Sequence, residues 1–299
     1  MTFRGRHLQG SPFTLEVMEQ PVYRRDYCRV RDKPASQFGS EGSDDGQFDD
    51  PSSVACNSRG EIVVADTENH RIQVFDGNGK FLFKFESQGN GNGQLQSPCG
   101  LTIDQRNNEI VVVDTFNQCI QIFDEKGTFL RVFGSQGKGD GQFSRPFGVV
   151  VDRQGNYVVT DAENNSIQIF NSNGQFVRKF GSEGEENGQM QSPIGVGLLS
   201  NGNIVVAEDN NRVQIFDFEG NFVRMVGAGQ VKHPCHLFVD SDDNILVADR
   251  ENNRVQVFHQ NGNHIKTIGT GQISNLLGVC MNREGRIIVT EGVNRISIF

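Results

Sequence analysis

The sequence predicts an all-β fold, a six-bladed β-propeller closed by pairing of an N-terminal strand with the C-terminal blade. Six copies of one pattern support this prediction, and each has an apolar triplet, an acid, a polar cluster and an alternating stretch that ends in Phe. The acids lie 41 to 48 residues apart, at Asp66, Asp114, Asp161, Glu208, Asp249 and Glu291. A strand-rich repeat of this length is typical of blades around a ring. The 35 Gly, 23 Phe and absence of Trp agree with short strands and tight turns.

Each repeat is expected to form four strands, and the third repeat shows the pattern most clearly. Its strands are predicted at residues 147–151, 157–160, 166–170 and 176–180, with turns at Gly155 and Gly174. Asn precedes Gly174 and several equivalent glycines, as hairpin turns with positive φ prefer. The second strands are apolar on both faces, which is typical of sheets covered on both sides. The fourth strands are mixed and are expected at the outer edge.

The two ends of the chain are predicted to meet in one blade. The sixth repeat stops at Phe299, after its third strand. Ahead of the first repeat, Gln37-Phe38-Gly39-Ser40 matches the ends of fourth strands such as Val132-Phe133-Gly134-Ser135. We therefore expect this N-terminal segment to supply the missing strand, which would leave no open sheet edge.

The distribution of charge weighs against nucleic acid as the default partner. The net charge is −9, but residues 1–33 carry seven basic and four acidic side chains, so residues 34–299 carry −12. Because binding to phosphate backbones depends on Lys and Arg, the ring should repel nucleic acid unless one face is locally basic, and no DNA binding is expected. No apolar run is long enough for a membrane helix, so no membrane partner is expected.

The six cysteines show no paired spacing that would indicate a disulfide framework or a zinc cage. Reduced thiols in a cytoplasmic protein are the prediction.

The repeated block resembles the NHL repeat. The resemblance rests on Gly46-Gln47-Phe48, Pro146-Phe147-Gly148-Val149 and Asn69-His70-Arg71-Ile72, and it extends over residues 34–299. Residues 10–13, Gly-Ser-Pro-Phe, resemble the end of a filamin-type, immunoglobulin-like domain, so 1–20 is interpreted as its last strand and 21–33 as a linker. This order resembles TRIM-NHL proteins, in which zinc-binding RING and B-box modules confer ubiquitin-ligase activity. The resemblance implies a fragment of a larger protein whose zinc modules lie outside this chain, and no cofactor in this segment.

In propellers of this family, ligands usually meet the face formed by loops that enter the first strands and loops that join the second to the third. The candidate residues for this face, with protein or RNA as ligand, are His70, Arg145, Phe147, Asn165, Asn211, His233 and His236. RNA would need cations for phosphate and flat groups for unstacked bases. A solvated polar rim without a specific ligand is the alternative interpretation.

Other polar residues are predicted to be structural. Arg71, Arg212, Arg254 and Arg295 follow the repeated acids by four or five residues, which favours an acid–Arg clasp over ligand contact. The acids are spread around a ring, so they do not form a catalytic pair. His233-Pro234-Cys235-His236 is the one His/Cys cluster, but alternate residues of a strand point apart, so no metal site and no catalytic residue is assigned.

Two functions stay open at this point. The first is a non-catalytic recognition module of a TRIM-type ubiquitin ligase that binds protein substrates or partners through one propeller face. The alternative is sequence- or structure-specific binding of single-stranded or stem-loop RNA for post-transcriptional repression. A basic face on the acidic ring would favour RNA, and an acidic or apolar face would favour protein.

Overall fold

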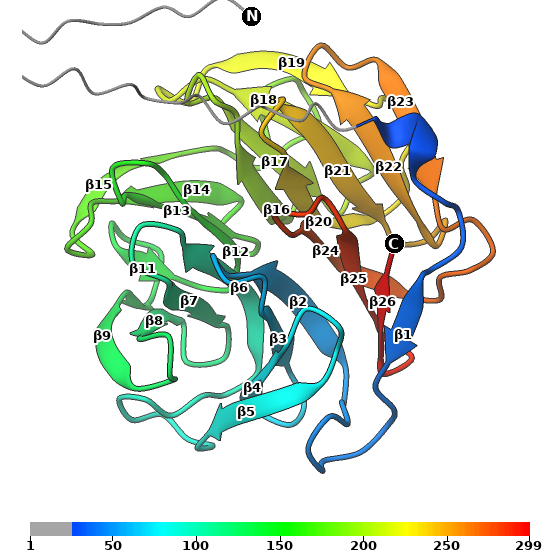
Figure 1. Ribbon diagram of the computed structural model, residues 1–299. Coiled ribbons are helices and arrows are strands. Elements are labelled where there is room, and N and C mark those ends of the chain that lie inside the picture. The colour runs from blue at the N-terminus through cyan, green and yellow to red at the C-terminus, as the bar shows by residue number, and fades with distance from the viewer. Residues whose placement is uncertain (1–25) are drawn as a thin grey trace, which may run out of the picture.

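The computed structural model describes residues 26–299, and in this range the strands form six four-stranded antiparallel sheets around a central channel (Figure 1). The first three blades are β2 (Pro51–Cys56), β3 (Ile62–Asp66), β4 (Arg71–Phe75) and β5 (Phe81–Glu86); β6 (Pro98–Asp104), β7 (Glu109–Asp114), β8 (Cys119–Phe123) and β9 (Phe129–Phe133); and β12 (Pro146–Val151), β13 (Tyr157–Asp161), β14 (Ser166–Phe170) and β15 (Phe176–Phe180). The next two are β16 (Pro193–Leu198), β17 (Ile204–Glu208), β18 (Arg212–Phe216) and β19 (Phe222–Val226); and β20 (Pro234–Val239), β21 (Asn244–Asp249), β22 (Arg254–His259) and β23 (His264–Ile268). The all-β prediction is confirmed.

The sixth blade is built from both ends of the described chain. It contains β24 (Leu276–Met281), β25 (Ile287–Glu291), β26 (Arg295–Ile298) and the N-terminal β1 (Ser36–Phe38). β1 pairs antiparallel with β26, with Gln37 opposite Ser297, and the blue and red strands lie side by side in Figure 1. This pairing agrees with the expected closure of the ring.

The segment ahead of β1 also contacts the propeller. The 3-10 helix η1 (Tyr27–Arg29) buries Tyr27, whose hydroxyl donates to Asp240 Oδ2 at 2.6 Å. Asp32 accepts a hydrogen bond from the backbone N–H of Gly269 at 2.9 Å. Residues 26–33 of the predicted linker are therefore docked on blades 5 and 6. The predicted filamin strand at 1–20 and the rest of the linker lie outside the described residues.

The hydrophobic core lies between blades. Buried side chains from each blade pack against those of the next; for example, Val113 and Ile120 of the second blade share a cluster with Tyr157 and Val159 of the third. Phe at the end of each of the first four third strands packs against other Phe rings, as in Phe133 and Phe170 at 4.8 Å. Apolar second strands are thus buried on both faces, as predicted.

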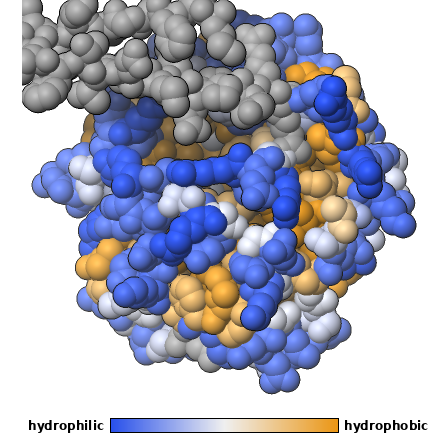
Figure 2. All heavy atoms as spheres, viewed as in Figure 1, coloured by the Kyte–Doolittle hydropathy of each residue, from blue (hydrophilic) through white to orange (hydrophobic). Residues whose placement is uncertain are grey.

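The first strands lie around the central channel and the fourth strands at the periphery (Figure 1). A short parallel pair, β10 (Ser135–Gln136) and β11 (Gln142–Phe143), lies in the connection between blades 2 and 3. Hydrophilic residues cover most of the face seen in Figure 2, with small hydrophobic patches between them. In residues 26–299 no helix has the length and apolarity to cross a membrane.

Candidate functional site

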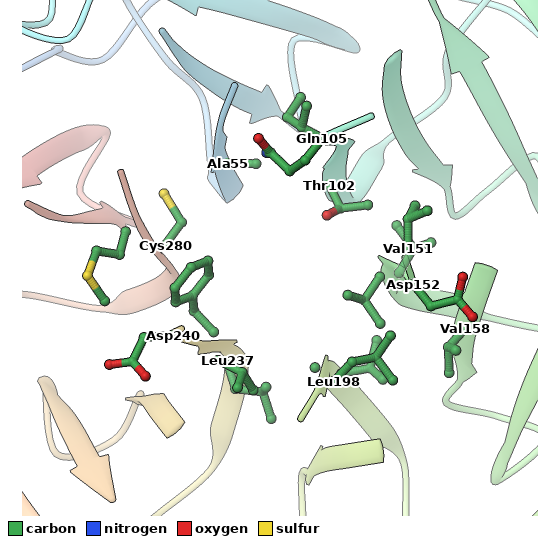
Figure 3. Close-up of a pocket in the computed structure, with 18 of the residues that line it drawn as sticks. Ala55, Thr102, Gln105, Val151, Asp152, Val158, Leu198, Leu237, Asp240 and Cys280 are labelled. Carbon is green, nitrogen blue, oxygen red and sulfur yellow. The ribbon is translucent and has the colours of Figure 1, made fainter. Parts of the chain in front are cut away.

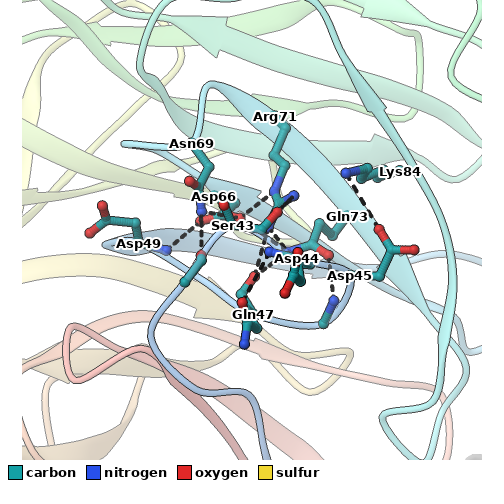
Figure 4. Close-up of polar contacts among 12 residues, drawn as sticks. Ser43, Asp44, Asp45, Gln47, Asp49, Asp66, Asn69, Arg71, Gln73 and Lys84 are labelled. Carbon is teal, nitrogen blue, oxygen red and sulfur yellow. Dashed lines mark hydrogen bonds and ion pairs between the residues drawn. The ribbon is translucent and has the colours of Figure 1, made fainter.

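The repeated acid is the centre of a buried polar network, shown for the first blade in Figure 4. Asp66 is fully buried and accepts hydrogen bonds from Arg71 Nε at 2.6 Å, Gln73 Nε2 at 3.0 Å and the backbone N–H of Asp49 at 2.7 Å. Arg71 also donates to the carbonyl oxygens of Ser43, Asp44 and Gln47. The network joins β3, β4 and the loop that leads into the blade, so its role is to hold that loop in place.

The predicted acid–Arg clasp recurs in the other three blades that have the Arg. The N–O distances are 2.8 Å for Arg212–Glu208, 2.8 Å for Arg254–Asp249 and 2.6 Å for Arg295–Glu291. All four pairs lie within one blade. The structural interpretation of these arginines is confirmed. The four acids are completely buried, so their carboxylates contact the protein interior and not a ligand.

We call the surface formed by the loops into the first strands and the loops from second to third strands the top face. Three candidate residues on this face accept hydrogen bonds from the backbone of the next blade. His70 Nδ1 accepts from the backbone N–H of Ser97 at 3.0 Å, Asn165 Oδ1 from Ser192 at 2.8 Å and Asn211 Oδ1 from His233 at 2.8 Å.

Each of these three residues has positive φ, 48 to 68°, which aims its side chain at the next blade. Asn253 and Asn294 make the same contact in their blades. The polar cluster of the repeat therefore has a structural task, and ligand binding by His70, Asn165 and Asn211 stays a prediction.

Arg145 is an exposed residue of the predicted site and lies over the half-buried Phe147. The guanidinium carbon of Arg145 lies 5.1 Å from the centroid of the Phe147 ring, a cation–π arrangement. Arg145 is exposed and pairs with no carboxylate within residues 26–299. Its backbone also differs from the other blades, because its N–H donates to Asp161 of its own blade.

Sequence reasoning missed Phe116, which lies on the loop between β7 and β8. Thr115 Oγ1 donates to the carbonyl of Pro146 at 2.8 Å, so the loop that carries Phe116 contacts the loop that carries Arg145. Phe116 is 60% exposed, the highest value among the large apolar side chains described. The sequence did contain a signal for Phe116, because three other repeats have a glutamate at the equivalent position, namely Glu68, Glu163 and Glu251.

His233 is held by acids. Its Nδ1 lies 2.7 Å from Asp209 Oδ1 and its Nε2 lies 3.2 Å from Glu251 Oε1, while Lys232 contacts Glu251 at 2.6 Å. Burial and then the charge of Glu68 raise the pKa of Asp50 on the same face, whereas Arg250 opposes the shift. The two residues before each first strand and the loops from second to third strands carry the acids Asp49, Asp50, Glu68, Glu163, Asp209 and Glu251, against the cations Arg145, Lys232 and Arg250. The top face is therefore mixed in charge and rich in acids.

His236 lies apart from the other six candidates, because it belongs to the lining of the central channel. The channel encloses about 1030 Å³ and its lining includes none of those six. The structure therefore places His236 apart from the loop residues, and ligand binding by it stays a prediction. Its direction is set by the pleat of β20, which a linear motif does not show.

The position of His236 is occupied by glycine in four blades. A Cβ on Gly100 would lie 1.9 Å from the carbonyl oxygen of Phe147, and one on Gly195 would lie 2.3 Å from that of Cys235. The inner strands approach closely at those glycines, whereas blade 5 places an imidazole there instead. His236 makes no hydrogen bond within the described part of the chain, and desolvation lowers its pKa to about 4. It is thus neutral at pH 7.

The His233–His236 motif does not converge on one point, since His233 faces Asp209 and Glu251 while His236 lines the channel. Burial raises the pKa of Cys235 to about 11. Over residues 26–299 no group of three or more His, Cys, Asp or Glu side chains is arranged to hold a metal ion.

The fold, the repeated network and the loop ties can now be compared with known proteins. The NHL repeat family matches residues 48–75, 143–170 and 237–258, which lie in blades 1, 3 and 5. The chain is an NHL-repeat β-propeller.

Its repeats are homologous to those of TRIM-NHL proteins. It is 46% identical over 67 residues to the brain tumor protein of Drosophila melanogaster, 35% over 82 residues to the lin-41 protein of Caenorhabditis elegans, and 39% over 84 residues to the E3 ubiquitin-protein ligase TRIM71 of Bos taurus. These matches cover 22%, 27% and 28% of this chain but only 6%, 7% and 9% of the relatives.

Solved structures share the architecture. A gluconolactonase from Xanthomonas campestris superimposes with a TM-score of 0.66 at 14% identity, covering 85% of this chain and 87% of that one. Virginiamycin B lyase from Staphylococcus aureus gives 0.62 at 14% identity, covering 90% and 95%. At this identity the likeness concerns the fold alone.

Proposed function

We propose that this propeller is a non-catalytic recognition module that binds a protein partner through its top face. The observation that carries the proposal is Phe116, a phenyl ring 60% exposed on a loop that Thr115 joins to the backbone between Arg145 and Phe147. Exposed aromatic and Arg side chains are the residue types that most often dominate protein interfaces. Ile194, which follows the first-strand proline of blade 4, is half-buried and adds apolar surface.

The charge of the top face supports protein over nucleic acid. Six carboxylates and three cations stand at the two positions before each first strand and in the loops from second to third strands, and His233 lies between two of these acids. Such a surface attracts a segment that presents Lys or Arg around an apolar anchor, and it repels phosphate. The partner we propose is a protein segment of that composition.

The relatives suggest the setting of this module. One is named an E3 ubiquitin-protein ligase and another, from Caenorhabditis elegans, a RING finger protein. We propose that this chain recruits substrates as part of a cytoplasmic RING-type ubiquitin ligase, with zinc held by RING and B-box modules elsewhere in the parent protein.

The test compares two exposed apolar residues. Immobilised wild-type protein, Phe116→Ala and Val177→Ala are used to capture proteins from a nuclease-treated cytosolic extract, with quantitative mass spectrometry as the readout. Val177 is the matched control because it is 50% exposed on the outer strand β15. Loss of a central anchor costs about 2 kcal/mol, so specific partners should fall about 30-fold with Phe116→Ala and stay unchanged with Val177→Ala. Equal capture by all three proteins contradicts the proposal.

RNA is the second candidate, because the Arg145 guanidinium over the Phe147 ring is a platform on which an unpaired base can stack. Selection from a random RNA pool at physiological salt tests it, with Arg145→Glu alongside. Arg153→Glu is the matched control, since Arg153 is exposed on the loop after β12 at the opposite end of the strand. A motif that is enriched by wild type and by Arg153→Glu, but lost with Arg145→Glu, would establish RNA binding at the top face and replace the protein proposal.

A further inference from the structure

Two cysteine thiols from opposite ends of the chain meet where the ring closes. Cys56 ends β2 in blade 1, and Cys280 lies in β24 in blade 6, 224 residues away. Their sulfur atoms are 3.6 Å apart. The other four cysteines, Cys28, Cys99, Cys119 and Cys235, have no such contact with a second thiol within residues 26–299.

The two thiols lie at the seam that also depends on β1. Blade 6 contains both chain ends, and its neighbour across the seam is blade 1. Side chains from the two blades share one core cluster, in which Cys56 and Cys280 pack with Val54 and Ile288. Polar contacts across the same seam are few, such as Asp50 N–H to Asn294 Oδ1 at 3.0 Å and Thr290 Oγ1 to the Ser52 carbonyl at 3.3 Å.

The central channel is the route by which a small solute would approach the two thiols. Cys56 and Cys280 line it, and Figure 3 shows Cys280 in its wall near the strand of Ala55. Cys56 is 9% exposed and Cys280 is 3% exposed, so Cys56 is the more accessible of the two. The channel mouth is polar, with Asn57, Asp152 and Asp240 among its residues, so water and polar solutes can enter.

We propose that Cys56 and Cys280 are an oxidation site that forms a disulfide in response to small hydroperoxides, and that this bond locks the closed ring. The Cys56 sulfur attacks one peroxide oxygen, the O–O bond breaks, and a sulfenic acid and one water form. The Cys280 sulfur then attacks the sulfenic sulfur, the S–O bond breaks and a second water leaves. Two thiols are oxidised and the peroxide is reduced to two waters.

The geometry requires little movement. A disulfide needs the sulfurs at about 2.05 Å, so they must approach by about 1.5 Å, which side-chain rotation can supply. Burial and the neighbouring thiol raise the pKa of Cys280, and since the thiolate is the nucleophile, the second step, in which Cys280 attacks, should be slow at neutral pH and faster in alkali. The bond would close a very long loop of chain, the case in which a cross-link restricts the unfolded state most.

The test uses the full chain with Cys28→Ser, which removes the exposed thiol. The protein is treated with hydrogen peroxide, the remaining thiols are alkylated, and tryptic peptides are mapped without reduction. The expected product is a disulfide between residues 32–59 and residues 267–283, each of which contains one cysteine. The urea midpoint of the oxidised protein should rise and return to its starting value after reduction.

Two variants serve as controls. Cys56→Ser should abolish both the linked peptides and the rise of the urea midpoint. Cys119→Ser should leave both intact, since Cys119 is equally buried but has no thiol beside it. The proposal is overturned if peroxide yields only sulfinic acid or unmodified thiols at positions 56 and 280, or if the linked protein unfolds at the same urea concentration as the reduced one. Both results are independent of the proposed partner.

Discussion

The substitution Arg71→Met tests the role of the buried polar network. The Arg71 side chain is 1% exposed, and it donates to Asp66, Ser43, Asp44 and Gln47. Met has a similar length and removes every one of these donors. The variant would leave the fully buried Asp66 carboxylate without its ion-pair partner and three carbonyl oxygens without these hydrogen bonds.

The magnitude follows from burial. Removing one partner of a buried ion pair lowers the free energy of unfolding by about 3 to 5 kcal/mol, because the other charge is left uncompensated. For a domain of this size the melting temperature should fall by about 6 to 10 °C. Arg254→Met is the matched control, since Arg254 is 29% exposed and contacts Asp249 and one carbonyl oxygen. Asp249 is as buried as Asp66, but Arg254 is partly exposed, so water can take its place beside the carboxylate and its loss should cost less, about 1 to 3 kcal/mol.

The free energy of unfolding of both variants is measured by urea titration. Far-UV circular dichroism is the signal, because the chain has no Trp whose fluorescence could report unfolding. The double variant Asp66→Asn/Arg71→Met should recover part of the loss, since the buried charge is gone. Equal losses for Arg71→Met and Arg254→Met, or a loss below about 1 kcal/mol for Arg71→Met, would refute the argument that burial sets the value of this contact.

Three other predictions concern the ring and its channel. Deletion of residues 28–38 removes β1 and two of the three residues of η1, so the protein should aggregate in light-scattering measurements; a soluble deletion with unchanged stability would contradict closure by β1. Gly100→Ala places a Cβ 1.9 Å from the Phe147 carbonyl oxygen, so the free energy of unfolding should fall by about 1 to 3 kcal/mol, and an unchanged urea midpoint would contradict this. The pKa of His236 is about 4 in the fold, whereas the unfolded chain takes up the proton near its ordinary value of 6.5. Stability from His236 is therefore complete above pH 6.5 and is lost as the pH falls towards 4, by about 1 to 3 kcal/mol relative to His236→Gln, and parallel pH profiles of the two proteins would exclude this role.

The roles of the repeated acids and arginines could be predicted from the sequence because their contacts lie within a single repeat. Asp66 and Arg71 are five residues apart on adjacent ends of a hairpin, so their pairing follows from the strand alternation. The Asn positions were visible as well, but their partner is the backbone of the next blade, which no spacing within one repeat shows. From the sequence, these polar residues therefore suggested ligand binding. In the structure they form hydrogen bonds between neighbouring blades.

Residues that depart from the repeat were the informative ones for the candidate site. Phe116 replaces a glutamate and was overlooked because the comparison favoured charged and polar positions. His236 replaces a glycine and was noticed, but its direction depends on the pleat of β20 and on the distance to the neighbouring inner strand. Whether a side chain faces solvent, a channel or another blade is decided by atoms from elsewhere in the chain.

The sequence by itself determined the number of blades, the strands within them, the closing segment and the acid–Arg pairs, because alternation, turn glycines and near neighbours are local properties. The tertiary structure alone decided which side chains share a surface: the contact of Cys56 with Cys280, the placement of His236 in the channel and the grouping of Phe116 with Arg145. The physical reason is the ring itself. Its closure brings residues more than 200 positions apart into contact, and the approach of six inner strands to one axis sets which positions have room for a side chain.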